Sequence, residues 1–215
     1  MEKPPFEVVK EAEGWLLFWA RFELIPGGLD RLSALRAEVA RRARARLNLE
    51  SLSAHPTVAG LRKLFRAAGC DPTRYRPASE ALLRRVLKGE ELPALHPFVD
   101  INNCLSVELA VPCCVMREGS FVPPLVMRTG RAGEGYESLR GPFNLEGKPL
   151  LADARGPCDA PITGNTRVKV TAETQRAWLV AYLPADAVTP EAADKALAGL
   201  VEAAPVAKAI LTAAS

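Results

Sequence analysis

Residues 92–116 read LPALHPFVDINNCLSVELAVPCCVM, and the other predicted elements support or cover this stretch. Pro93 and Pro97 hold the approach to it extended, because a residue that precedes proline avoids the helical conformation. The apolar residues that follow recur with a few polar ones between them, which predicts a short and mostly buried helix. Asp100 is the candidate N-cap of this helix, and Pro112 ends it.

The predicted helix carries polar side chains among buried neighbours. Each needs a hydrogen-bond partner, so such groups line either a structural network or a ligand pocket. Adjacent asparagines more often cap or turn a chain than bind a ligand, so taken alone these residues favour the structural role. The residues concerned are Asn102, Asn103, Ser106 and Glu108.

The composition is that of an ordinary globular protein. Of the 215 residues, 48% are hydrophobic and 25% are charged, which allows one well-packed core. The longest apolar run, residues 15–20, is far shorter than the roughly 18 residues that span a bilayer, and Glu2 with Lys3 does not resemble the start of a signal peptide. We therefore expect one domain over residues 1–215, a cytoplasmic location and no membrane partner.

The cysteines indicate neither disulfides nor a metal site. There are five, an odd number at irregular spacing, and none belongs to a C-x-x-C pair. A zinc site built from them would lack the paired ligand spacing that makes such a prediction specific. His55 and His96 each stand beside a proline, where a turn or cap role is the simpler explanation. We expect reduced thiols, no metal and no cofactor.

Positive charge is concentrated in the first half of the chain. Between Arg31 and Glu90 there are 14 Lys and Arg against 5 Asp and Glu, a net charge of +9, whereas the whole chain carries +3. A basic region of this kind favours a polyanionic partner through counterion release, and tRNA is the expected one. A solvated, arginine-rich helical surface explains the same charge equally well. The candidate RNA-binding residues are Arg62, Lys63, Arg84, Arg85 and Lys88.

The order of the predicted elements, helices first and then strands, indicates an α+β fold with an antiparallel or mixed sheet. The first predicted helix has arginines on several sides, as a solvated coat would, and Arg131–Gly135 is interpreted as a hairpin turn. A final apolar turn is expected beyond Pro205. The predicted helices are Asp30–Leu47, Thr57–Ala68, the segment between Pro77 and Gly89, the helix before Pro112, and Thr189–Ala203. The predicted strands are Val8–Leu24, Cys113–Met116, Pro124–Met127, Tyr136–Leu139, Pro149–Ala152, Val168–Val170 and Ala177–Leu183.

Several ordered blocks resemble one known family. They read FRAAGCDPTRYRPASEALLRRVLKGEELPALHPFVDINNCLSVELAVP (65–112), LVMRTGRAGEGYESLRG (125–141), LLADARG (150–156) and TRVKVTAETQRAWLV (166–180). Together they resemble the free-standing relatives of the B3/B4 domain, the aminoacyl-tRNA editing domain in the β subunit of bacterial phenylalanyl-tRNA synthetase. The resemblance implies a three-layer α+β fold that contains a β sandwich, with residues 1–56 as an N-terminal strand and helix portion packed on it.

The resemblance also implies a pocket. In the synthetase domain a helix carries an asparagine of the editing pocket, which matches Asn103. A pocket histidine falls eleven residues later, where this chain has Cys114. The segment Asp159–Arg167 departs from the family as well, because free-standing relatives tend to have a Trp- and Arg-rich block there. Nothing adjacent in sequence activates Cys113 or Cys114 as a nucleophile, so we interpret both as residues that shape the pocket.

Three functions follow from these observations. The leading hypothesis is a trans-acting deacylase of mischarged aminoacyl-tRNA, in which Asn103 orients the ester and water attacks it. The alternatives are a non-catalytic tRNA-binding module and a binder of a free amino acid. tRNA or aminoacyl-tRNA is the expected partner, DNA is not expected, and the sequence points to no particular synthetase. The predicted substrate-binding residues are Asp100, Asn102, Ser106, Cys113, Cys114 and Arg128.

Overall fold

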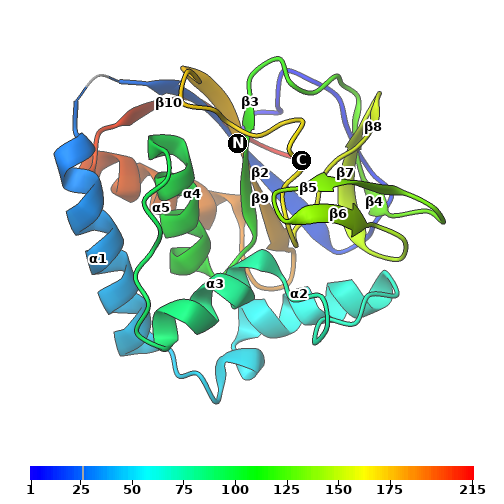
Figure 1. The fold of residues 1–215 in the computed structure, drawn as a ribbon, viewed down its shortest axis with the longest axis horizontal. Helices are drawn as coiled ribbons and strands as arrows, with labels where there is room; N and C mark the ends of the chain where they lie inside the picture. Colours follow the sequence, from blue (N-terminus) through cyan, green and yellow to red (C-terminus); the bar gives the residue numbers. More distant parts are fainter. Residues whose placement is uncertain (26) are drawn as a thin grey trace.

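The computed structural model describes residues 1–25 and 27–215, and its main elements form three layers (Figure 1). Helices cover one face of a central sheet, and a second sheet covers the other face. The central sheet is antiparallel, in the order β10-β2-β9-β3. Its strands are β2 (Trp15–Leu24), β3 (Cys113–Arg117), β9 (Arg176–Pro184) and β10 (Ala207–Ala214), and the helices on it are α1 (Leu29–Arg46), α4 (Pro97–Leu109) and α5 (Pro190–Ala203).

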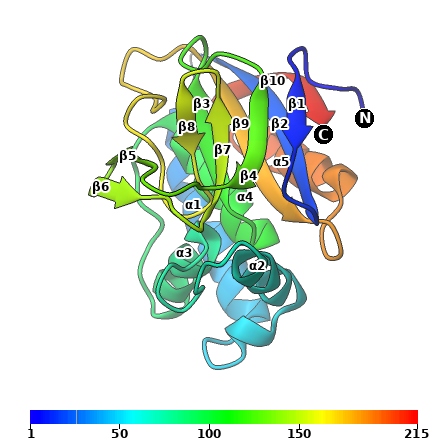
Figure 2. The same ribbon diagram turned by 90° about the vertical axis from the view of Figure 1, so that its right-hand side faces the viewer.

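The second sheet has the order β1-β4-β7-β8, in which β1 runs parallel to β4 and the other neighbours are antiparallel. A two-stranded hairpin, β5 and β6, lies beside it, and two further helices, α2 and α3, lie at one end of the sheets (Figure 2). The strands are β1 (Val8–Lys10), β4 (Leu125–Thr129), β5 (Gly135–Ser138), β6 (Gly141–Asn144), β7 (Pro149–Asp153) and β8 (Gly156–Asp159). The helices are α2 (Pro56–Ala67) and α3 (Ala78–Leu87), and the short 3-10 helix η1 (Leu52–Ala54) precedes α2.

Alternation along the central strands builds a core on each side of the central sheet. Successive side chains of a strand point to opposite faces. In β2, Phe18 and Phe22 pack under the helices, whereas Trp15, Leu17 and Trp19 pack into the space between the two sheets. Because both faces are buried, β2 reads as a nearly continuous apolar run. The predicted three-layer α+β fold with a β sandwich is confirmed.

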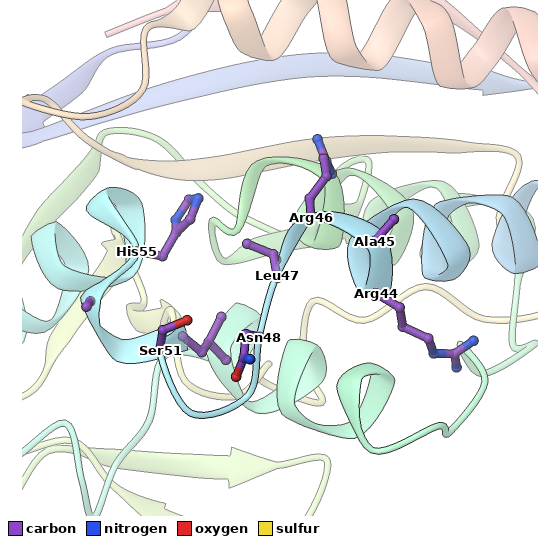
Figure 3. Close-up of a pocket in the computed structure, with 9 residues that line it drawn as sticks. Arg44, Ala45, Arg46, Leu47, Asn48, Ser51 and His55 are labelled. Carbon is purple, nitrogen blue, oxygen red and sulfur yellow. The ribbon is translucent and has the colours of Figure 1, made fainter.

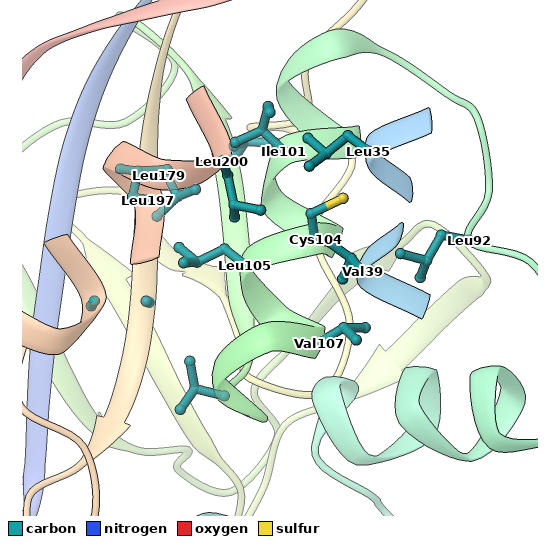
Figure 4. Packing of buried hydrophobic residues seen from close by; sticks show 14 of the residues in the cluster. Leu35, Val39, Leu92, Ile101, Cys104, Leu105, Val107, Leu179, Leu197 and Leu200 are labelled. Atoms are coloured by element: carbon teal, nitrogen blue, oxygen red, sulfur yellow. The ribbon is translucent and has the colours of Figure 1, made fainter. Parts of the chain in front are cut away.

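Helix α4 occupies the middle of the helical layer. Its apolar residues, among them Cys104 and Leu105, belong to one buried cluster with Leu35 and Val39 of α1 and with Leu197 of α5 (Figure 4). The helix ends where Ala110 adopts a left-handed conformation (φ 59°), just before the proline that cannot continue it. The prediction of a short, mostly buried helix in this stretch is therefore confirmed.

The cap of α4 was predicted wrongly. His96, not Asp100, is the N-cap residue, and its ring nitrogen Nδ1 accepts a hydrogen bond from the Phe98 backbone N–H at 3.2 Å. Asp100 lies within the first turn, where it accepts from the Leu95 N–H at 3.0 Å and pairs with Arg36 of α1. The cap role proposed for His96 is thus confirmed.

The arginines of α1 are also more than a solvated coat. Arg42 and Arg46 pair with Glu108 of α4, and Arg44 donates to the backbone carbonyls of Val86 and Glu90. The charged face of α1 therefore joins α1 to α3 and α4. Spacing along one helix could not reveal these partners, because they lie far away in the sequence.

The N-terminal strand is divided. Residues 8–10 form β1 in the second sheet and residues 15–24 form β2 in the central sheet, so the single predicted strand is wrong. The chain changes sheet near Gly14, whose φ of 78° is a conformation that glycine adopts at little cost.

Other differences concern short segments. Residues 168–170 are not a strand, because Asn165 Oδ1 accepts the Arg167 N–H at 2.8 Å and holds the preceding residues in a turn. The segment beyond Pro205 is the strand β10, which completes the central sheet beside β2. The turn at residues 131–135 does not close a hairpin, since β5 pairs with β6 and not with β4. The strands β6 and β8 were not predicted.

Candidate functional site

The polar side of α4 faces a pocket of about 820 Å³, which we call the α4 pocket. Its walls come from α3, α4, the first residues of β3, the loop between β5 and β6, and the segment after β8. This volume lies within the roughly 300 to 1,000 Å³ typical of small-molecule sites. Elements from both the helical layer and the sandwich therefore meet around one cavity.

The structure brings most of the predicted substrate-binding residues together here. Asn102, Asn103, Ser106, Cys113 and Cys114 all line the pocket. The reason is local: α4 presents its polar side to the start of β3, because the chain turns back at Ala110, between α4 and β3.

The structure does not bring the other two predicted residues, Asp100 and Arg128, to the pocket lining. Asp100 is occupied by Arg36 at the start of α4. Arg128 lies on β4 and pairs with Glu134, with both guanidinium nitrogens 2.7 Å from carboxylate oxygens. Hydrogen bonds from Arg128 hold the pKa of Glu134 at about 2, so this pair stays ionised at neutral pH.

Asn103 is half-buried on the pocket wall. Its side-chain oxygen accepts a long hydrogen bond, 3.4 Å, from the Asn102 amide nitrogen. Among the described residues its own amide nitrogen makes no hydrogen bond, so that group is available to a ligand. Ser106 differs, because its hydroxyl donates to the Val111 carbonyl at 2.8 Å.

The adjacent cysteines are poor nucleophiles. Burial raises the pKa of Cys113, and burial together with the neighbouring Asp159 carboxyl raises the pKa of Cys114 well above that of an ordinary thiol. The nucleophilic form of cysteine is the thiolate, so both remain unreactive at neutral pH. This agrees with the interpretation of these residues as parts of the pocket wall.

Asp159, at the end of β8, is a buried pocket residue that sequence reasoning missed. It is fully buried, and its Oδ2 accepts a hydrogen bond from the Tyr182 hydroxyl at 2.5 Å. Burial raises its pKa to about 7, although the bond from Tyr182 acts in the opposite direction. The only sequence signal was a lone acid at the start of the segment that departs from the family pattern.

The lining residues also carry a set of cations. All five are exposed, and they come from the segment before α3, from α3 itself, from the β5–β6 loop and from the segment before β9. An excess of positive charge around a low-dielectric cavity favours anionic ligands. These residues are Arg74, Arg76, Arg85, Arg140 and Lys169.

The residues predicted to bind RNA lie on α2, on α3 and just after α3. Arg62 and Arg84 both pair with the buried Glu80, at 2.9 and 3.1 Å. Arg85 pairs with Glu90 at 2.7 Å, and Lys63 lies 4.0 Å from Asp186. Lys88 is exposed after the end of α3. RNA binding by this set stays a prediction.

A second, smaller pocket of about 520 Å³ lies between the end of α1 and the start of α2 (Figure 3). Its two arginines are already engaged, Arg44 with backbone carbonyls and Arg46 with Glu108. Burial, and secondly the positive charge of Arg46, lower the pKa of His55 here. This pocket holds none of the predicted site residues.

Within residues 1–25 and 27–215, no group of three or more His, Cys, Asp and Glu is arranged to hold a metal ion. All five cysteines are free thiols. No helix in the same residues is both long and apolar enough to cross a membrane.

Comparisons with known proteins place the chain in a family. Among solved structures it is similar to an N-terminal fragment of the phenylalanyl-tRNA synthetase β subunit from Pyrococcus horikoshii, with 14% identity and a TM-score of 0.45. That match covers 100% of this chain and 51% of the other, so the chain spans about half the length of that structure. None of the curated proteins compared with the chain matches it. The model of the B3/4 domain matches residues 60–198, which include α4 and the whole pocket, and the chain therefore belongs to the B3/4 domain family.

Proposed function

We propose that the α4 pocket accepts the aminoacylated 3′ end of a tRNA and hydrolyses the ester of a wrongly attached amino acid. The observation that carries this proposal is the meeting of polar α4 side chains with exposed cations around one cavity of about 820 Å³. A terminal nucleotide brings phosphates for the cations, and the amino acid brings a carbonyl for the hydrogen-bond donors.

Water is the nucleophile in this proposal. An aminoacyl ester is already reactive, so orienting its carbonyl and a water molecule can accelerate hydrolysis without a strong base. The free amide nitrogen of Asn103 is the candidate donor to the carbonyl oxygen as negative charge develops on it. Cys114 does not attack, because burial keeps its thiol protonated.

The RNA approaches through the cations at the pocket. Arg140 and Lys169 lie outside the described ion pairs, which leaves their charge available to phosphates. Arg85 is the one residue of the predicted RNA-binding set that also lines the pocket. Of the other four, Lys63 and Lys88 extend the exposed basic surface, whereas Arg62 and Arg84 pair with Glu80.

A non-catalytic tRNA-binding module is the second candidate function. One observation favours it: Cys114, at the position of the family's pocket histidine, is a protonated thiol that supplies no imidazole. Such a module would bind aminoacyl-tRNA through the same cavity and the cations that line it, but would release the aminoacyl-tRNA unchanged.

Single-turnover hydrolysis across a panel of mischarged tRNAs, beside a tRNA-binding assay, tests the proposal. Asn103→Ala should slow hydrolysis about 100-fold to 1000-fold, or about 3 to 4 kcal/mol, because one donor to the developing oxyanion is lost, while tRNA affinity stays close to normal. Cys114→Ala should change the choice of amino acid more than the rate. Asn48→Ala, an asparagine of the other pocket, is the matched control and should leave the rate unchanged.

Two outcomes would overturn the proposed mechanism. An inactive Cys114→Ala variant, together with an acyl group trapped on the wild-type thiol, would establish covalent catalysis. A wild-type protein that binds tRNA tightly but hydrolyses none of the charged tRNAs would establish the binding module.

A further inference from the structure

Two buried oxygen atoms in the pocket lack a hydrogen-bond donor among the described residues. They are Oδ1 of Asp159 and Oδ1 of Asn102. The Asp159 side chain is fully buried and that of Asn102 nearly so, and both residues line the α4 pocket. Burying a polar atom without a partner costs free energy, so each such atom calls for a reason. A ligand that supplies the missing donors is one.

Although cations line the pocket, no cation among the described residues acts on the pKa of Asp159. The titratable groups that face it come from four strands, and burial raises the pKa of each, so all are neutral at pH 7. They are Cys114 on β3, Tyr136 on β5, Cys158 on β8 and Tyr182 on β9. A carboxylate in this position therefore has no countercharge of its own.

Building on the proposed function, we infer that Asp159 forms a subsite for a primary ammonium group of the ligand, with Asn102 Oδ1 as a further acceptor in the same pocket. The ammonium can be the α-ammonium of the aminoacyl group or an ammonium on its side chain. A hydroxyl donor is already present, since Tyr182 occupies Oδ2, so what the site lacks is positive charge. An ammonium supplies three donors and the charge that a buried carboxylate needs.

The subsite makes binding dependent on pH. The carboxyl must lose its proton to bind an ammonium, and its pKa of about 7 means that it is half-protonated at neutral pH. Binding therefore releases protons near pH 7, and affinity falls as the pH drops below 7. An α-amine titrates at about 7.7 to 8.0, so its affinity falls again above that range. The optimum lies between the two pKa values.

The experiment uses amide-linked 3′-aminoacyl analogues of adenosine, which cannot be hydrolysed. Titration calorimetry in buffers of different ionisation enthalpy measures affinity and proton release for the phenylalanyl, Nα-acetylphenylalanyl, lysyl and Nα-acetyllysyl analogues. We expect Nα-acetylation of the phenylalanyl analogue to weaken binding at least tenfold and to abolish proton release. If Nα-acetyllysine keeps the affinity of lysine, the ammonium is that of the side chain.

Two variants connect the effect to Asp159. Asp159→Asn keeps the shape but cannot ionise, and it should bind free and acetylated analogues equally, with no proton release. Gly164→Ala keeps the charge but places a methyl group 3.8 Å from Asp159 Oδ1, and it should weaken the free amines severalfold. Thermal unfolding checks that both variants fold.

The outcomes separate this inference from the proposed function. If acetylation does not weaken the phenylalanyl analogue and the lysyl analogues bind no more tightly than the phenylalanyl ones, or if no analogue binds, the ammonium subsite is wrong even where charged tRNA is hydrolysed. If free amines bind through Asp159 and yet no charged tRNA is hydrolysed, the subsite stands and the deacylase does not.

Discussion

In the described part of this molecule, buried acids occur in two settings, either beside a cation or in the pocket without one. Among the helices, Glu80 is fully buried and meets the guanidinium groups of Arg62 and Arg84, and Asp100 is nearly buried and meets Arg36. In the pocket, Asp159 is equally buried, but the groups that donate to it, the Tyr182 and Cys114 side chains and the Ala160 backbone N–H, carry no positive charge. Where an acid serves the fold, the chain supplies a cation from a neighbouring segment, as Arg167 also does for the buried Asp153 of β7. Where an acid faces the cavity, the chain supplies none.

The difference follows from the energetics of buried charge. A carboxylate removed from water is stable only with a countercharge and full hydrogen bonding. Without them the carboxyl keeps its proton to higher pH, as Asp159 does. Groups perturbed in this way concentrate at functional sites, because an unmet electrostatic demand is what a ligand can satisfy. Three predictions test this contrast.

The largest effect is expected at Glu80. Glu80→Ala leaves the guanidinium groups of Arg62 and Arg84, and the more distant one of Arg76, without their carboxylate. Breaking a buried ion pair from one side typically costs about 3 to 5 kcal/mol. Chemical denaturation should show this loss in the free energy of unfolding. Glu38→Ala is the control, because Glu38 makes an exposed pair with Arg41 and should leave the denaturation midpoint unchanged. Equal effects of the two substitutions would remove the distinction between buried and exposed pairs.

The second prediction is that replacing Asp159 raises the stability at neutral pH, whereas replacing Glu80 lowers it. The pKa of Asp159 is about 7 in the folded protein, whereas that of an ordinary aspartate is 3.8, so the unfolded chain loses this proton first as the pH rises. Asp159 therefore contributes a loss of stability between about pH 4 and pH 7, of at most about 4 kcal/mol at 1.36 kcal/mol per pKa unit. Asp159→Asn has no such proton. Its stability relative to the wild type should rise by up to this amount between pH 4 and pH 8.

Chemical denaturation of the wild type and of Asp159→Asn between pH 4 and pH 8 measures this difference in stability. A difference between variant and wild type that does not change with pH would mean that Asp159 is ionised at pH 4, and the contrast with Glu80 would then disappear. The same experiment on Tyr182→Phe sharpens the result. Removing the hydroxyl that lowers the pKa of Asp159 should move the loss of stability to higher pH.

The two settings also show what the sequence could predict. The spacing of the apolar side chains in residues 97–109 and the proline after them were enough to predict α4. Both the helical spacing and the end of a helix can be read from residues that are close in the sequence. The pairing of Glu80 with Arg62, 18 residues away, and of Asp100 with Arg36, 64 residues away, depends on how helices pack and has no local signal. Asn103 was found through the family resemblance. Asp159 was missed because it lies where that resemblance fails.

The smallest effect concerns RNA. If charges that serve the fold are unavailable to a partner, Arg140 and Lys169 should contribute more to tRNA binding than Arg62 and Arg84. Each phosphate contact contributes about 0.7 to 0.9 to the slope of log affinity against log salt. The double variant Arg140→Ala/Lys169→Ala should therefore flatten the slope by about 1 to 2. Arg62→Ala/Arg84→Ala should leave the slope unchanged and lower the stability instead.

Binding isotherms at several salt concentrations, beside unfolding curves for both double variants, distinguish the alternatives. Arg140 and Lys169 are exposed residues of the pocket lining. They can contribute to tRNA binding only if phosphates reach the opening of the pocket. If the slope flattens instead in Arg62→Ala/Arg84→Ala, the arginines that neutralise Glu80 also contact RNA. The basic surface of α2 and α3 would then be the face that binds RNA. Cations that pair with buried acids would also bind RNA, so the contrast between the two settings would not extend to RNA binding.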